Sequence, residues 1–116
     1  MKRVVFVRDK TNKHSIRALL AAYEKWFPEK DYYVLTPQDA FDFLEEDDLA
    51  LFSFLTGTSS AYIDYVTKLK AKLPKINTVC GGAHASARSE DMLNYFDGVC
   101  TGEGEESIKD IIDMAH

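Results

Sequence analysis

The sequence predicts an α/β fold with one parallel sheet of five strands, covered by helices on both faces. Short apolar runs alternate along the whole chain with longer segments whose apolar residues recur at helical spacing. The runs are continuously apolar, as expected for strands that are buried on both sides. Strands separated by helices pair in parallel through right-handed crossovers. We expect the strands at 3–8, 32–36, 49–55, 76–80 and 98–101.

The helices are expected at 12–27, 38–44, 59–72, 89–95 and 105–114. In the first of them, Ile16, Leu19 and Tyr23 lie on one face, and Pro28 ends the helix. The acidic run 45–48 is expected to be a solvated turn. Five strands in a chain of this length close most simply in the flavodoxin-like order 2-1-3-4-5, with a topological switch point between the first and third strands.

The composition indicates one ordinary globular domain spanning residues 1–116, with 46% hydrophobic and 28% charged residues. A net charge of −5 argues against a nucleic-acid partner. No apolar run is long enough to cross a membrane, and the N-terminus is expected to form a strand and not a signal peptide, so we expect a cytoplasmic protein. Cys80 and Cys100 form no Cys-x-x-Cys pair and are expected to be buried hydrophobes, with no metal site.

Glycines mark one edge of the predicted sheet as a binding site. Five of the six glycines come just after a predicted strand. Ligands of open α/β sheets bind at the carboxyl ends of the strands, and a missing Cβ lets a ligand approach the backbone. We therefore expect the site to be built from 9–14, 53–60, 81–87 and 102–106.

Several polar residues at this edge suit a ligand, but none forms a catalytic set. The stretch 53–60 contains five hydroxyls ahead of a predicted helix, where a phosphate would also be favoured. Glu103 lies between two glycines, and His84 is expected to hydrogen-bond the backbone in its glycine loop. No Ser–His–acid or Cys–His arrangement is evident, so the sequence predicts a cleft that binds without catalysing a reaction.

Two glycine loops carry a resemblance to a known family. Ser53-Phe54-Leu55, with 25 residues between Leu55 and Gly81-Gly82, resembles the Ser-x-Leu and Gly-Gly elements of cobalamin-binding domains. The segments 80–86 and 101–106 together resemble the N-terminal cobalamin-binding domain of radical S-adenosylmethionine enzymes. This resemblance covers the whole chain in order and spacing.

The resemblance implies a cobalamin cofactor whose corrin ring lies over the strand ends, with its nucleotide tail beside Ser53, Leu55 and Gly81-Gly82. The iron–sulfur cluster and S-adenosylmethionine would belong to a downstream radical domain in cis, because the Cys-x-x-x-Cys-x-x-Cys run is absent here. This chain would then be the non-catalytic N-terminal part of a longer enzyme. The implied cofactor-binding residues are Asp9, Thr11, Asn12, Ser53, Leu55, Thr56, Gly57, Thr58, Gly81, Gly82, Ala83, His84, Gly102, Glu103 and Gly104.

The chain departs from the wider family at the lower cobalt ligand. Other cobalamin domains have Asp-x-His-x-x-Gly after the first strand, and the histidine binds cobalt. Here Asp9 is kept, but Thr11 stands at the histidine position and His14 at the glycine position. A hydroxyl is a poor cobalt ligand, so cobalamin is expected to bind without a histidine from this chain, as in the radical-enzyme branch.

Two other functions compete with this interpretation. One is a flavodoxin-like binding or signalling domain for a different phosphate-bearing small molecule, with corrin binding lost. A phosphoacceptor receiver is disfavoured because the third strand runs into Ser53-Phe54 without an aspartate, and a flavin-phosphate site because the loop after the first strand lacks glycine. The other function is a small α/β enzyme using Glu103 or His84, for which no nucleophile is evident.

Overall fold

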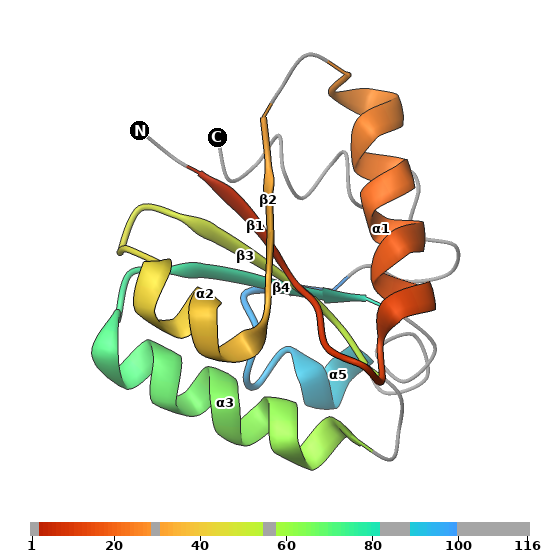
Figure 1. The fold of residues 1–116 in the computed structure, drawn as a ribbon. Helices are drawn as coiled ribbons and strands as arrows, with labels where there is room; N and C mark the ends of the chain where they lie inside the picture. Colours follow the sequence, from red (N-terminus) through yellow and green to blue (C-terminus); the bar gives the residue numbers. More distant parts are fainter. Residues whose placement is uncertain (1–2, 29–30, 55–57, 82–88, 100–116) are drawn as a thin grey trace.

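Five strands form one parallel sheet in the order β2-β1-β3-β4-β5, as the sequence predicts (Figure 1). The structure is a computed structural model that describes residues 3–28, 31–54, 58–81 and 89–99. The expected last helix and Cys100 lie outside these residues, whereas Cys80 is buried as predicted. The strands are β1 (Val4–Val7), β2 (Tyr33–Leu35), β3 (Leu49–Ser53), β4 (Asn77–Gly81) and β5 (Gly98–Val99).

Helices cover both faces of the sheet (Figure 1). Val4 and Phe6 of β1 pack in a core with α1, whereas Val5 and Val7 pack in a second core on the opposite face. This alternation follows from the two-residue repeat of a strand. The helices are α1 (Lys13–Trp26) on the first face and α2 (Pro37–Phe43), α3 (Ser59–Lys72) and α5 (Ser89–Met92) on the second.

Most element boundaries differ from the predicted ones by one to three residues, and the ends of β4 and α5 are two examples. Strand β4 continues through Gly81, because its ladder with β3 extends to the pair Ser53–Gly81. A glycine can continue the ladder because the hydrogen bonds come from the backbone. Helix α5 ends at Met92, and the chain then turns, with the Asn94 and Tyr95 N–H groups donating to backbone carbonyls three residues earlier.

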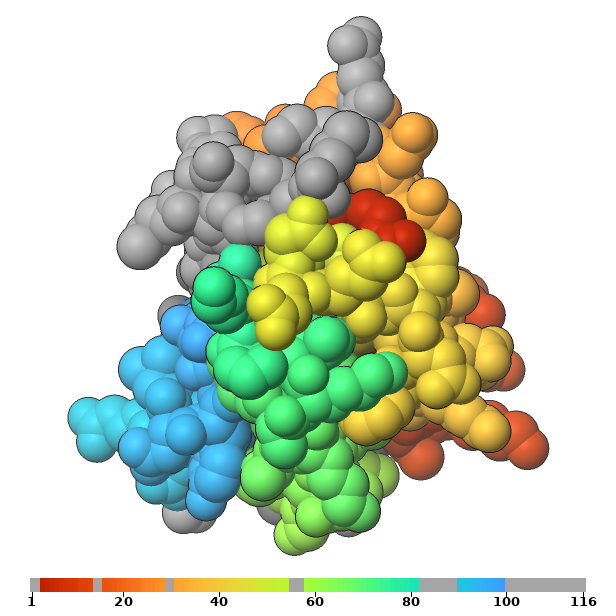
Figure 2. Space-filling view, turned by 90° about the vertical axis from the view of Figure 1, so that its left-hand side faces the viewer, coloured from red at the N-terminus to blue at the C-terminus, as the bar shows by residue number. Residues whose placement is uncertain are grey.

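Helix α3 is the central element of the second face. In Figure 2 its green residues lie between the yellow residues of the α2 region and the blue residues of the α5–β5 segment. Tyr62, Val66 and Leu69 form its buried stripe, as the periodicity predicts. The Tyr62 ring stacks on Phe54 with ring centroids 5.2 Å apart. This packing fixes α3 against the carboxyl end of β3.

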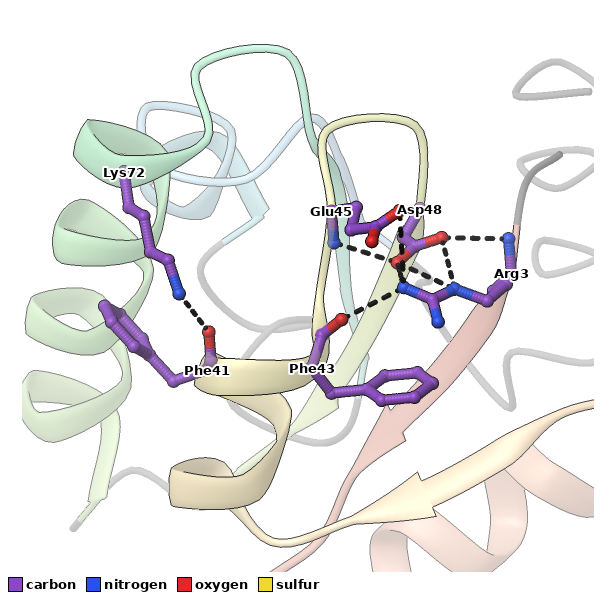
Figure 3. Close-up of polar contacts among 6 residues, drawn as sticks. All are labelled: Arg3, Phe41, Phe43, Glu45, Asp48 and Lys72. Carbon is purple, nitrogen blue, oxygen red and sulfur yellow. Dashed lines mark hydrogen bonds and ion pairs between the residues drawn. The ribbon is translucent and has the colours of Figure 1, made fainter.

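An ion pair between Arg3 and Asp48 holds the amino-terminal edge of the sheet (Figure 3). The Asp48 carboxylate accepts from Arg3 Nη2 at 2.7 Å and from the backbone N–H groups of Arg3 (3.1 Å) and Glu45 (2.9 Å). The Arg3 guanidinium also donates to Phe43 O and lies 4.0 Å from the centroid of the Phe43 ring. Asp48 is 0% exposed, so the expectation of a solvated turn over 45–48 is wrong for this residue.

Another cation joins α3 to α2 on the same side of the molecule (Figure 3). Lys72 Nζ donates to Phe41 O at 2.7 Å and lies 4.7 Å from the centroid of the Phe41 ring. The end of α3 is thereby tied to α2, far from the carboxyl ends of the strands.

We expect Asp48→Ala to lower the free energy of unfolding by about 3–5 kcal/mol, because the substitution leaves a partly buried guanidinium and two N–H groups without their acceptor. Urea denaturation measures the change. Glu46→Ala, at an exposed position two residues away, should change stability by less than about 0.5 kcal/mol. Equal effects of the two substitutions would contradict a stabilising role for the buried pair.

Candidate functional site

The loop after β1 is closed by the side chain of Asp9. Its Oδ1 accepts from Thr11 N at 2.7 Å, Thr11 Oγ1 at 2.6 Å and Asn12 N at 3.1 Å. Its Oδ2 accepts from the Tyr62 hydroxyl, which comes from α3 on the far side of β3. Aspartates commonly close turns by binding N–H groups two or three residues on. The additional bond to Tyr62 joins this turn to a distant helix.

Asn12 connects the carboxyl ends of β1 and β3. Its Nδ2 donates to Val7 O at 3.1 Å and Ser53 O at 2.8 Å and lies 3.2 Å from the Tyr62 hydroxyl. Its Oδ1 accepts from Asp9 N at 2.8 Å, and the residue is 1% exposed. The paired register of β1 and β3 ends at Phe6–Leu51, so both carbonyls lie beyond it. The Asn12 amide supplies the donors for these carbonyls.

The hydrogen bonds around Asp9 stabilise its ionised form. Burial by itself raises the pKa of Asp9, but the bonds from the Thr11 and Tyr62 side chains and from two backbone N–H groups outweigh it, so the pKa of Asp9 lies below its ordinary value. Burial and the adjacent carboxylate raise the pKa of Tyr62. At neutral pH the pair is therefore a neutral phenol donating to a carboxylate.

Ser53 ends β3 with a buried hydroxyl. The residue is 0% exposed, and its Oγ makes no hydrogen bond with any residue that the structure describes. Gly81 lies opposite Ser53 in the ladder, so no Cβ occupies the space beside it on β4. A buried hydroxyl without a partner is destabilising, and a ligand that bonds to it would remove that cost. This pair fits a polar ligand group entering at the ends of β3 and β4.

The structure brings together the predicted site residues that it describes at the β1 and β3 ends. Asp9, Thr11, Asn12 and the Ser53 backbone belong to one hydrogen-bond network, with Gly81 beside Ser53. Thr58 directly precedes α3. The backbone of His14 lies in the first turn of α1, as predicted. The predicted residues outside the described part of the chain are Leu55, Thr56, Gly57, Gly82, Ala83, His84, Gly102, Glu103 and Gly104.

Tyr62 belongs to this network, although the sequence indicates only its place in the apolar stripe of α3. Its phenol is the one feature that could have indicated a hydrogen bond to the site, because a buried tyrosine hydroxyl usually finds a polar partner. The stripe places the ring in the core, and the strand order 1-3 brings its hydroxyl to Asp9.

Within 3–28, 31–54, 58–81 and 89–99, no three His, Cys, Asp or Glu side chains gather as metal ligands would. None of the helices in these ranges combines the length and apolarity needed to span a membrane.

We expect Tyr62→Phe to raise the pKa of Asp9 and to lower the free energy of unfolding by about 1.5–3 kcal/mol, because a buried bond to a charged group is lost. The Asp9 pKa follows from a carboxyl-carbon NMR titration. Because the pKa of Asp9 is lowered on folding, its stabilisation is present above the ordinary value of 3.8 and is lost as the pH falls below it. The variant should lose less stability over this acidic range.

Tyr65→Phe is the matched control for that experiment. The Tyr65 hydroxyl donates to Pro37 O at 2.6 Å, so its loss should cost about 1 kcal/mol and leave the Asp9 pKa unchanged. An unchanged Asp9 pKa in Tyr62→Phe would contradict the proposed coupling.

Comparison with known proteins is consistent with this geometry. Residues 31–112 match the family model of the B12 binding domain. No curated protein and no solved structure matches the chain. The matched segment covers most of the sequence, and the observed strand order is the flavodoxin-like order of such domains. The chain therefore belongs to the B12-binding domain family, which indicates that its ligand is a corrinoid.

Proposed function

We propose that this chain is the cobalamin-binding domain of a radical S-adenosylmethionine enzyme and that it holds the cofactor without a histidine below the cobalt. The observation that carries the proposal is the buried Ser53 hydroxyl beside Gly81, which has no hydrogen-bond partner among the described residues and lies at the sheet edge where ligands of this fold bind. The domain itself is proposed to bind and position the cofactor, and the reaction belongs to the longer enzyme.

Some of the described residues would contact the cofactor, and others position the strand ends around it. Ser53 would hydrogen-bond a polar atom of the nucleotide tail, and Gly81 would leave room for that tail. Asp9 and Asn12 keep the ends of β1 and β3 in place through their bonds to Thr11, Val7 O and Ser53 O. When bound, cobalamin supplies the cobalt chemistry, while the protein supplies position and environment.

The proposal of histidine-free binding rests on the loop after β1. Thr11 stands where the family has its histidine, and its hydroxyl donates to Asp9 at 2.6 Å. A neutral hydroxyl binds cobalt poorly compared with an imidazole. The first turn of α1 is anchored by the bond from Ile16 N to Asn12 O at 2.9 Å. Moving His14 over the ring would require breaking such bonds.

The radical-enzyme context is supported by the two glycine loops, 80–86 and 101–106, considered together. The test is the coding sequence downstream of this chain. An in-frame Cys-x-x-x-Cys-x-x-Cys run supports a radical domain in cis. A stop codon without such a run in the same reading frame would contradict that arrangement.

We expect Ser53→Ala to weaken binding of hydroxocobalamin roughly tenfold, corresponding to one lost hydrogen bond, while leaving the unfolding free energy unchanged or higher. The weakening follows from loss of the bond to the ligand, and the retained stability from removal of an unsatisfied polar group. Absorbance titration and urea denaturation measure the two quantities.

Thr78→Val is the control for a buried hydroxyl that has a protein partner. Thr78 is as buried as Ser53, but its hydroxyl is hydrogen-bonded to Asp97. The variant should lose stability and keep its affinity for cobalamin. If Ser53→Ala instead lost stability and kept its affinity, Ser53 would be a structural residue and not a ligand contact.

We expect His14→Ala to leave the absorption and electron paramagnetic resonance spectra of bound cob(II)alamin unchanged, because no histidine of this chain is proposed to bind cobalt. Nitrogen superhyperfine splitting that disappears in this variant would identify His14 as the lower ligand. A folded sample that binds no cobalamin would overturn the corrinoid assignment and favour a different phosphate-bearing ligand.

A further inference from the structure

A small pocket of about 50 Å³ lies between α1 and the β1–β2 edge of the sheet. Its apolar lining is Phe6, Ile16, Leu20 and Val34. The remaining described residues around it are three cations and no acid, although the whole chain carries a net charge of −5. These cations are Arg8, Lys13 and Arg17.

The charges of these three side chains are not neutralised by the described protein. None of them forms an ion pair with a residue in the described ranges, and all three are exposed. Asp9 is the nearest acid in the sequence, directly after Arg8, but its oxygens accept from Thr11, Asn12 and Tyr62. The Asp9 carboxylate is thus engaged by the loop that leads into α1 and by Tyr62 of α3, and it forms no ion pair with Arg8, Lys13 or Arg17 among the described residues.

Among the described residues, this arrangement of charges is unfavourable without a bound anion. Lys13 and Arg17 are four residues apart on α1, where like charges repel each other. They also lie near the positive end of the helix dipole, and the first turn of α1 contains no acid. Helix α3 has the favourable arrangement, with Asp64 and Lys68 four residues apart and their charged atoms 3.0 Å apart. A bound anion would turn the repulsion on α1 into attraction.

We propose that this pocket binds a small organic oxyanion, a phosphate or carboxylate group attached to a short apolar group. The oxyanion would lie among the three cations, and the apolar group would contact Ile16, Leu20 and Val34. The volume is a few times that needed for one water, which suits a single oxyanion group. The pocket adjoins the candidate corrinoid site, because Arg8 and Lys13 flank the loop of Asp9 and Asn12, but it extends toward β2 and α1, whereas Ser53 and Gly81 lie on β3 and β4.

The test is an NMR titration of the cobalamin-free chain at low ionic strength with n-butyl phosphate. We expect saturable amide shifts around Arg8, Lys13, Arg17 and Val34. Butyrate in a second arm distinguishes a carboxylate from a phosphate preference, and either ligand binding at these positions supports the proposal. Butan-1-ol, which has the same apolar group without the charge, should not bind.

Lys13→Gln should weaken the binding about tenfold, because a charge-assisted hydrogen bond is lost. It should also raise the melting temperature in anion-free buffer, because it removes a repulsive charge from the start of α1. Lys75→Gln removes one charge from an exposed loop residue outside the pocket and should change neither quantity.

The proposal is overturned if no saturable shifts occur, if both lysine variants weaken binding equally, or if butan-1-ol binds as well as the anions. Since no cobalamin is present, failure here leaves the corrinoid proposal intact, and failure of cobalamin binding leaves this one intact.

Discussion

The ligand edge of this domain depends on the side-chain amide of Asn12. Strands β1 and β3 are neighbours, yet the chain leaves β1 toward α1 on one face and β3 toward α3 on the other (Figure 1). Their paired register ends before the carbonyls of Val7 and Ser53, which therefore need donors from elsewhere. Asn12 donates to both and accepts from Asp9 N with its own oxygen.

Few side chains could replace Asn12 in this role. An aspartate of the same shape has no donors, and a leucine would leave both carbonyls and the Asp9 N–H unsatisfied. Because Asn12 is buried and linked to Tyr62 as well, it fixes three elements, β1, β3 and α3, at the point where the predicted cofactor would lie. One planar amide thus fixes the positions of the carboxyl ends of β1 and β3 relative to each other.

The two ends of the sheet differ in how completely their polar groups are paired. At the amino-terminal edge, the buried Asp48 carboxylate receives donors from the Arg3 side chain and from two backbone N–H groups. At the carboxyl edge, the Ser53 hydroxyl is buried and α1 begins with exposed cations, and neither has a partner among the residues that the structure describes. Buried polar groups are normally satisfied, and exceptions concentrate at functional sites. The carboxyl edge therefore combines a stabilising network around Asp9 and Asn12 with the polar groups that are open to a ligand.

Local patterns in the sequence were sufficient to predict the five strands and the helices within the described residues, and the simplest closure of the sheet gave their order. The apolar runs identified the five strands, and the stripe of Tyr62, Val66 and Leu69 identified the buried face of α3. The burial of Asp48 and the bond from Tyr62 to Asp9 could not be predicted in this way. They join residues 45 and 53 positions apart in the sequence, so they exist only once the strand order has brought the partners together. The sequence pattern of the charged turn around Asp48, and that of the amphipathic stripe with Tyr62, would be the same whether or not these distant partners existed.

Under the proposed histidine-free binding, the network around Asp9 would make His14 a poor substitute for a histidine at the Thr11 position. A metal-bound histidine usually donates its second ring N–H to a carboxylate or carbonyl. A carboxylate offers about four lone-pair positions. Asp9 already accepts from Thr11 N, Thr11 Oγ1, Asn12 N and the Tyr62 hydroxyl. An imidazole that approached the cobalt from this loop would find Oδ1 of Asp9 occupied by three donors and only one position left on Oδ2, beside the Tyr62 hydroxyl. It would therefore have to compete with the bonds that hold the turn and α3 together.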